Sequence, residues 1–175
     1  TYILAWTTTP WTLPSNVGLC VNAGYEYIKA QVNGEYLILA GALAEKVLPE
    51  GYEVVERFTG AELVGTEYEQ LMPFVAMPEG GCRVVADDYV TLEDGTVVHT
   101  APAFGEDDYR VCKDNGLPFI QPVDAQGRFT GTPWDGTFVK DADPAIIEYL
   151  RERGLLHQAL PYEHNYPFCW RCDTP

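Results

Sequence analysis

Apolar and polar positions alternate in the first half of the chain in a way that predicts short β-strands. Residues 26–40 read EYIKAQVNGEYLILA, and two strand-like runs there flank Asn33-Gly34, a pair that favours a tight hairpin turn. A second hairpin turn is predicted at Asp94-Gly95. The other runs with strand character cover residues 52–58, 82–87 and 96–101.

Three segments carry the end signals of helices. Residues 41–48 are predicted to form a short helix. A second helix is predicted over residues 105–116, which have three acids in the first turn and Asn-Gly at the end. In residues 143–154, Asp143 is the predicted N-cap, with proline next and glycine just past the end. Strands predominate and do not alternate regularly with helices. We therefore predict an α+β fold, mostly β, with a closed or nearly closed β-barrel core and peripheral α-helices.

Composition indicates a folded, strongly acidic protein. The 175 residues are 46% hydrophobic and 13% aromatic, enough for one buried core. A net charge of −15 disfavours tight autonomous binding to nucleic acid or an anionic membrane, although contact with one nucleotide end in a small site stays open. The sequence has no signal-peptide pattern and no apolar run of about 18 residues, and its five cysteines are an odd number. These features predict a cytoplasmic protein with reduced thiols and no membrane partner.

An unusual segment, which we call the threonine segment, spans residues 6–16 and reads WTTTPWTLPSN. Threonine favours strands, but Pro10 and Pro14 lack a backbone N–H, so strand pairing is predicted to stop near Thr9. On local pattern alone the segment is interpreted as an edge strand with satisfied hydroxyls. The alternative is that its hydroxyls face a ligand, and the residues concerned are Thr7, Thr8 and Thr9.

A second segment, the His–Asp loop, spans residues 99–109 and reads HTAPAFGEDDY. His99 ends a strand and Asp108 falls in the first turn of the next helix, so both side chains can face one cleft. Each also has a simpler explanation, because an acid in that turn stabilises a helix by about 0.3–1 kcal/mol and a strand-end histidine is commonly structural. A metal site with Glu106 and Asp107 is disfavoured, since adjacent acids on a helix point in different directions.

Together the two segments resemble the signature segments of the editing domain inserted in class I isoleucyl-tRNA synthetases. The last residues, YPFCWRCDTP, are similar to the segment where that insertion returns to the catalytic domain. The matches lie at the start, middle and end, so the resemblance covers essentially the whole chain. It implies a single editing domain over residues 1–165 and a return segment over residues 166–175.

Two details favour the isoleucine branch of this group. The valyl and leucyl enzymes have Thr-Thr-Arg-Pro where this chain has Thr8-Thr9-Pro10, and Pro-Ala-His where it has Pro102-Ala103-Phe104. An editing domain of the valyl or leucyl branch is nevertheless the nearest alternative. A non-catalytic acidic β-barrel that serves as an interaction module is an alternative from a different class.

The resemblance implies that the chain hydrolyses the ester of valine wrongly attached to tRNA(Ile), with valyl-adenylate as an additional candidate substrate. One methylene group supplies only about 1–3 kcal/mol of discrimination, a magnitude established on these very enzymes, so a second site must reject isoleucine by size. The implied partners are the tRNA acceptor end carrying valine and the rest of the synthetase chain. No cofactor is expected for editing, and the chain by itself is expected to be monomeric.

The resemblance also assigns roles to residues. Asp108 would hold the α-ammonium group of the substrate, while Trp11 and His99 would wall a small apolar pocket. Whether His99 is a base or a steric wall stays open, and we favour the wall. The threonine hydroxyls would bind the terminal adenosine, the ester or the attacking water. The remaining substrate-binding candidates are Trp6, which is equally well a core residue, Thr100 and Ala101.

Cys169 and Cys172 form a C-x-x-C pair near the end of the chain. One such pair is half of a tetrahedral zinc site, and no second pair is present in the sequence. By resemblance, a matching pair can lie elsewhere in the parent enzyme. Zinc is therefore expected as a candidate ligand of the parent enzyme, not of this chain alone.

Overall fold

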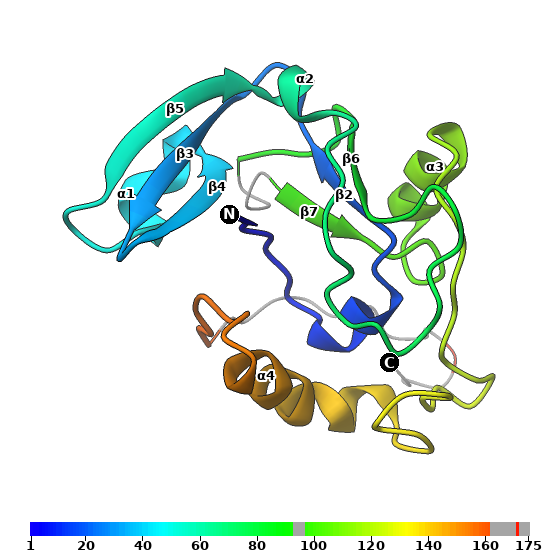
Figure 1. The fold of residues 1–175 in the computed structure, drawn as a ribbon. Coiled ribbons are helices and arrows are strands. Elements are labelled where there is room, and N and C mark those ends of the chain that lie inside the picture. Colours follow the sequence, from blue (N-terminus) through cyan, green and yellow to red (C-terminus); the bar gives the residue numbers. More distant parts are fainter. Residues whose placement is uncertain (93–96, 162–170, 172–175) are drawn as a thin grey trace.

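The computed structural model describes residues 1–92, 97–161 and 171. Over these residues the chain forms two separate mixed β-sheets with helices around them (Figure 1). The four-stranded sheet, with α1 (Ala44–Val47) against it, lies to one side of the three-stranded sheet. Helix α3 (Glu106–Asp114) lies on the other side, and α4 (Asp143–Glu152) runs below both in this view.

The larger sheet has the order β1-β4-β3-β5, with β1 parallel to β4 and the other neighbours antiparallel. The predicted hairpin is confirmed, because Asn33 and Gly34 have φ values of 49° and 86° between the two central strands. Positive φ at both central residues is what the tight hairpin turn requires. The four strands are β1 (Tyr2–Ile3), β3 (Glu26–Val32), β4 (Glu35–Ala40) and β5 (Glu53–Thr59).

The smaller sheet, with the order β6-β2-β7, carries His99 at its edge. Its central strand runs parallel to β6 and antiparallel to β7, and His99 pairs in register with Leu19. The three strands are β2 (Gly18–Val21), β6 (Arg83–Ala86) and β7 (Val97–Thr100). The predicted strands at 82–87 and 96–101 are therefore present, whereas the predicted turn at Asp94-Gly95 lies outside the described residues.

The prediction of a closed or nearly closed barrel is wrong, because neither sheet closes on itself within the described residues. The edges of the smaller sheet are extended only by single bridges, from Trp6 to Val98 on one side and from Glu67 to Arg83 on the other. Closure needs continuous pairing around the whole sheet. Segments that could have supplied it, such as the proline- and glycine-containing residues 73–81, run as turns and bends instead.

All three predicted helices are confirmed, but the predicted N-cap of the last one is wrong. Ala142, not Asp143, is the N-cap residue of α4. The carboxylate of Asp143 instead accepts a hydrogen bond from the backbone N–H of Trp11. The other helical segments are η1 (Pro10–Ser15), η2 (Gly41–Leu43), α2 (Gly60–Leu63) and η3 (Val139–Ala142).

The threonine segment contains a 3-10 helix over Pro10–Ser15 and no strand. Regular pairing ends at Ile3, and only Trp6 makes an isolated bridge beyond it. Thr9 precedes the 3-10 helix η1, in which Pro10 occupies an opening position where its missing N–H costs nothing. Pro10 therefore starts a helix as well as ending the strand region.

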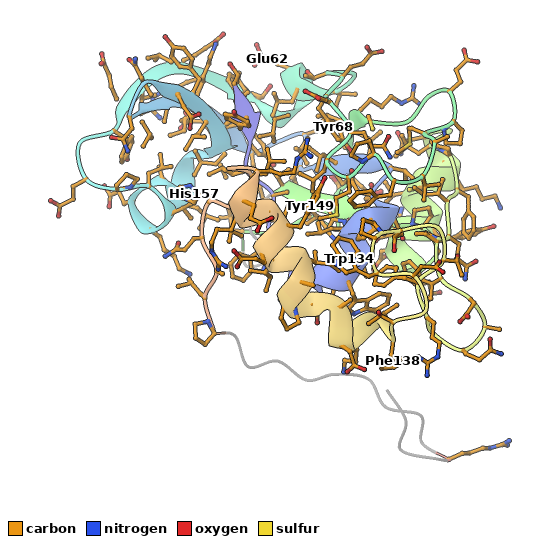
Figure 2. All side chains as sticks on the ribbon, turned by 60° about the horizontal axis from the view of Figure 1, so that its bottom comes forward. Glu62, Tyr68, Trp134, Phe138, Tyr149 and His157 are labelled. Carbon is orange, nitrogen blue, oxygen red and sulfur yellow. The ribbon has the colours of Figure 1, made fainter. Side chains whose placement is uncertain are left out.

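Helix α4 covers η1 through an apolar cluster that includes Leu13, Phe129 and Ile146. Trp134 and Tyr149 lie side by side in this region (Figure 2), with their ring centroids 5.9 Å apart. The cluster fixes η1 between α4 and the smaller sheet. In the described ranges no helix has the length and apolar character needed to cross a membrane.

Candidate functional site

Two contacts bring the threonine segment against the His–Asp loop. The Oγ1 atom of Thr12 lies 2.9 Å from Nε2 of His99, across 87 positions of sequence. The rings of Trp11 and Phe104 pack edge to face, with their centroids 4.8 Å apart and an interplanar angle of 69°. The two segments predicted to share a site therefore do lie together.

The 3-10 geometry of η1 arranges the threonine side chains. In a 3-10 helix, side chains three positions apart eclipse each other, which places Thr12 beside Thr9. The Thr12 hydroxyl donates to the Thr9 carbonyl oxygen at 2.9 Å, and the two hydroxyl oxygens are 3.3 Å apart. Oγ1 of Thr7 accepts the Thr9 backbone N–H at 3.1 Å. Thr7, Thr8 and Thr9 are all half-buried.

His99 is buried, with only 8% of its surface exposed. Burial disfavours the charged ring and lowers its pKa from 6.5 to about 4, so it is neutral at pH 7. Its Nδ1 atom is buried and has no hydrogen-bond partner among the described residues. The ring is thus a neutral group held by one hydrogen bond, between its Nε2 atom and the Thr12 hydroxyl.

Asp108 is half-buried at the start of α3 and is tied back to its own loop. Its Oδ2 atom accepts the backbone N–H of Ala101 at 2.9 Å. Burial raises the pKa of this carboxyl group, while the bond from Ala101 opposes the rise. A Cβ atom at Gly105 would lie 3.1 Å from the Asp108 Cγ, so glycine leaves the room that the carboxylate occupies.

Trp11 is anchored on both sides. Its backbone N–H donates to Oδ1 of Asp143 at 2.8 Å, and its ring contacts Phe104. The pKa of Asp143 is raised because the carboxyl group is desolvated, and the bond from Trp11 acts in the opposite direction. The start of α4 therefore positions the indole next to the His–Asp loop.

The remaining predicted substrate-binding residues lie in different surroundings. Trp6 is 38% exposed, and its backbone N–H donates to the Val97 carbonyl at 3.2 Å. Thr100 and Ala101 are buried, and Ala101 contributes its main-chain N–H to Asp108. Their side chains lie in the protein interior.

Three residues of this arrangement were not predicted from the sequence. Thr12 lies inside the threonine segment, three positions after Thr9 with Pro10 between them, and this spacing was the signal for a 3-10 turn. Phe104 lies inside the His–Asp loop, but no pattern indicates its contact with Trp11. Asp143 carries no local signal for its bond to Trp11, because the two are 132 residues apart.

The predicted zinc half-site, Cys169 and Cys172, lies outside the described residues. The described cysteines are buried, and desolvation raises the pKa of Cys20 to about 12 and of Cys112 to about 11. No group of three or more metal-ligating side chains occurs within residues 1–92, 97–161 and 171.

Solved structures define the fold class. The fold matches the crystal structure of GlLeuRS-CP1 with a TM-score of 0.72 and 15% identity, over 93% of this chain and 84% of that one. It also matches the editing domain of cytosolic leucyl-tRNA synthetase from P. knowlesi, with a TM-score of 0.62 and 14% identity, over 86% and 81%. At these identities the likeness shows the fold alone, which is that of a connective-peptide or editing domain.

Isoleucine–tRNA ligases are among the relatives found by sequence comparison. The chain is 58% identical to isoleucine–tRNA ligase of Clostridium novyi (strain NT) over 99% of its length, and 49% identical to that of Thermoplasma acidophilum over 100%. It spans 17% of the length of each of these relatives. No family model matches the chain. The resemblance indicated by the two segments is thus confirmed as a match to one segment of isoleucine–tRNA ligases.

Proposed function

We propose that the chain is an editing module of an isoleucine–tRNA ligase and hydrolyses the ester of Val-tRNA(Ile). The observation that carries the proposal is the contact between the two segments, through Thr12 with His99 and Trp11 with Phe104. This contact places the hydroxyl-rich threonine segment beside a loop that bears a desolvated carboxylate. The similarity to isoleucine–tRNA ligases supports the choice of amino acid and tRNA.

Asp108 is the proposed anchor for the α-ammonium group of the aminoacyl ester. One of its oxygens is bonded to the Ala101 amide, and an ionised carboxylate accepts about four hydrogen bonds, so capacity for the ammonium remains. A bound cation would also offset the desolvation that raises the Asp108 pKa. This role makes the site selective for substrates that carry a free amino group.

Trp11 and His99 are the proposed walls of the side-chain pocket. Each is fixed by a hydrogen bond with another element: Trp11 through its backbone N–H to Asp143 of α4, and His99 through its ring to Thr12 of η1. A pocket with fixed walls rejects an extra methylene at a cost of about 1–3 kcal/mol. Valine would fit and isoleucine would not.

The proposed reaction is direct attack of water on the ester carbonyl, without a covalent enzyme intermediate. The water oxygen bonds to the carbonyl carbon, and the bond from that carbon to the ribose oxygen breaks. The water oxygen becomes one oxygen of the released valine carboxylate, one water proton goes to the ribose hydroxyl, and the other goes to solvent. The hydroxyls of Thr7, Thr8 and Thr9 are the candidates that orient the water, the ester or the terminal adenosine. Trp6, Thr100 and Ala101 are proposed to support this binding, Thr100 and Ala101 through their place in the His–Asp loop.

The proposed partners follow from the same assignment. The module over residues 1–165 receives the acceptor end of tRNA(Ile) from the rest of the synthetase, to which residues 166–175 return. Editing itself is proposed to need no cofactor. Cys169 and Cys172 are proposed as half of a zinc site completed elsewhere in the parent enzyme, and a zinc measurement on the whole ligase tests this.

A deacylation panel tests the proposal. The chain is incubated with Val-tRNA(Ile), Thr-tRNA(Val) and Ile-tRNA(Leu), and with valyl-adenylate in a separate assay. We expect hydrolysis of Val-tRNA(Ile) well above the spontaneous rate and near-background rates for the other two tRNAs. Preference for either of the others would instead assign the valyl or leucyl branch. Absence of hydrolysis throughout would leave the non-catalytic alternative.

A further inference from the structure

The Thr12 hydroxyl lies at the centre of three polar contacts. Its oxygen is 2.9 Å from the Thr9 carbonyl oxygen, 3.3 Å from the Thr9 hydroxyl and 2.9 Å from Nε2 of His99. Thr12 is 6% exposed and His99 is 8% exposed, so water competes little for these bonds. The three contacts form one small network around the Thr12 hydroxyl.

Counting hydrogens in this network assigns the ring proton. A hydroxyl donates one hydrogen and accepts two, and a carbonyl oxygen only accepts. The single hydrogen of Thr12 is therefore directed to the Thr9 carbonyl. The other two contacts then have to donate to Thr12, which requires a hydrogen on Nε2 of His99.

We propose that Thr12 is a positioning residue that holds His99 as its Nε2–H tautomer and fixes the orientation of the ring in the site. In this arrangement the Thr12 hydroxyl donates one hydrogen bond, to the Thr9 carbonyl, and accepts two, from the Thr9 hydroxyl and from His99 Nε2–H. The lone pair of the ring then lies on Nδ1. The inference rests on the proposed function only for its catalytic consequence, because the tautomer is a property of the chain without substrate.

The opposite tautomer leaves the network less satisfied. With the hydrogen on Nδ1, Nε2 would need the Thr12 hydrogen, and the Thr9 carbonyl would lose its bond from that hydroxyl. The Nδ1–H group would also be buried with no acceptor among the described residues. Orphaned buried N–H groups are rare in native proteins, so this arrangement is disfavoured.

The protonation state of His99 supports the same assignment. Its pKa is lowered to about 4 by burial, so at neutral pH the ring carries a single hydrogen. One ring nitrogen is then a donor and the other an acceptor. Thr12 is the described side chain that decides between the two.

Nitrogen NMR of the ring measures the tautomer directly. The chain contains three histidines, so labelling histidine with ¹⁵N gives few signals, and loss of one set in His99→Gln assigns them. In the wild type we expect the ¹⁵N chemical shift of Nε2 to be that of a protonated ring nitrogen and the shift of Nδ1 to be that of a nitrogen with a lone pair. Thr12→Ser keeps the hydroxyl and should give the same shifts. Thr12→Val keeps the shape but removes the hydroxyl, and its ring should shift towards a mixture of tautomers.

The proposal is overturned if Nδ1 carries the hydrogen in the wild type, or if Thr12→Val leaves the ring signals unchanged. The wild-type spectrum decides the tautomer even if Thr12→Val does not fold.

Deacylation of Val-tRNA(Ile) tests the positioning role. Thr12→Val should lower kcat about tenfold with KM changed less than about twofold, the effect of one lost hydrogen bond, while Thr12→Ser stays within about twofold of wild type. A wild-type rate in Thr12→Val would refute the positioning role. A wild-type chain that deacylates nothing would instead refute the proposed function, and the NMR result would still decide the tautomer.

Discussion

Burial makes His99 sensitive to acid. Its pKa is 6.5 when exposed and about 4 in the folded chain, because the buried ring resists charge. Between these two values the unfolded chain takes up a proton that the folded chain does not. The folded state therefore loses stability as the pH falls through this window, by up to about 3 kcal/mol.

A comparison of unfolding free energies checks this. Urea denaturation at pH 7.5 and 4.5 should show that wild type loses about 2–3 kcal/mol more than His99→Gln over the same change of pH. His157→Gln, at an exposed position, is the matched control and should behave like wild type. Equal losses in wild type and His99→Gln would show that His99 is not the group responsible.

The sequence predicted the two segments of the site but not how the threonines use their hydroxyls. A strand period of two directs Thr8 and Thr9 to opposite faces, whereas the 3-10 period of three pairs Thr9 with Thr12. Pro10 fits both interpretations, since it ends strand pairing and also starts helices. Only the packing of η1 against His99 distinguishes them.

At the scale of elements, η1 depends on its neighbours. A 3-10 segment of six residues has weak hydrogen-bond geometry and gains its stability from packing. Two contacts supply it here, the apolar cluster under α4 and the bond from the Trp11 N–H to Asp143. The position of Trp11 should therefore depend on Asp143.

Asp143→Ala tests this dependence. Loss of the acceptor leaves the Trp11 N–H without its partner, which should destabilise the chain by about 1–3 kcal/mol and increase hydrolysis of Ile-tRNA(Ile) relative to Val-tRNA(Ile). Asp143→Asn keeps an oxygen acceptor and should lie between wild type and Asp143→Ala. Asp141→Ala changes an exposed acid nearby and is the control. Unchanged stability and selectivity in Asp143→Ala would contradict this account of η1.

Elements with local signals were predicted well, and long-range anchors were not. The Asn33-Gly34 turn and the ends of α3 follow from residues within a few positions of each other. Asp143 fits an N-cap in the sequence, yet its carboxylate accepts a hydrogen bond from the backbone N–H of Trp11, which is 132 positions away in sequence. A side chain with both a local and a distant candidate partner cannot be assigned from local pattern.

At the scale of the whole molecule, strand positions did not determine the architecture. Closure of a barrel depends on pairing between edges that are far apart in sequence. Here the edges of the smaller sheet carry only the isolated bridges at Trp6 and Glu67. The long irregular segments between α2 and β6 and between α3 and η3 cover the core without adding strands.

The charge of the molecule predicts weak binding of tRNA. With a net charge of −15, the chain repels a polyphosphate, and an acceptor end held by the rest of a synthetase needs little affinity of its own. We expect the chain alone to bind deacylated tRNA(Ile) with a Kd weaker than about 10 μM at physiological salt, as measured by fluorescence anisotropy. A sub-micromolar Kd would mean that the chain carries its own tRNA-binding surface.

The central claim is that the site selects an amino acid by size and holds it by its ammonium group. Its most direct test is the ratio of deacylation rates for Val-tRNA(Ile) and Ile-tRNA(Ile), measured with the chain and with Asp108→Ala. We predict that wild type hydrolyses the valine ester at least about tenfold faster than the isoleucine ester, and that Asp108→Ala loses this activity. Equal rates for the two esters, or full activity in Asp108→Ala, would contradict the claim.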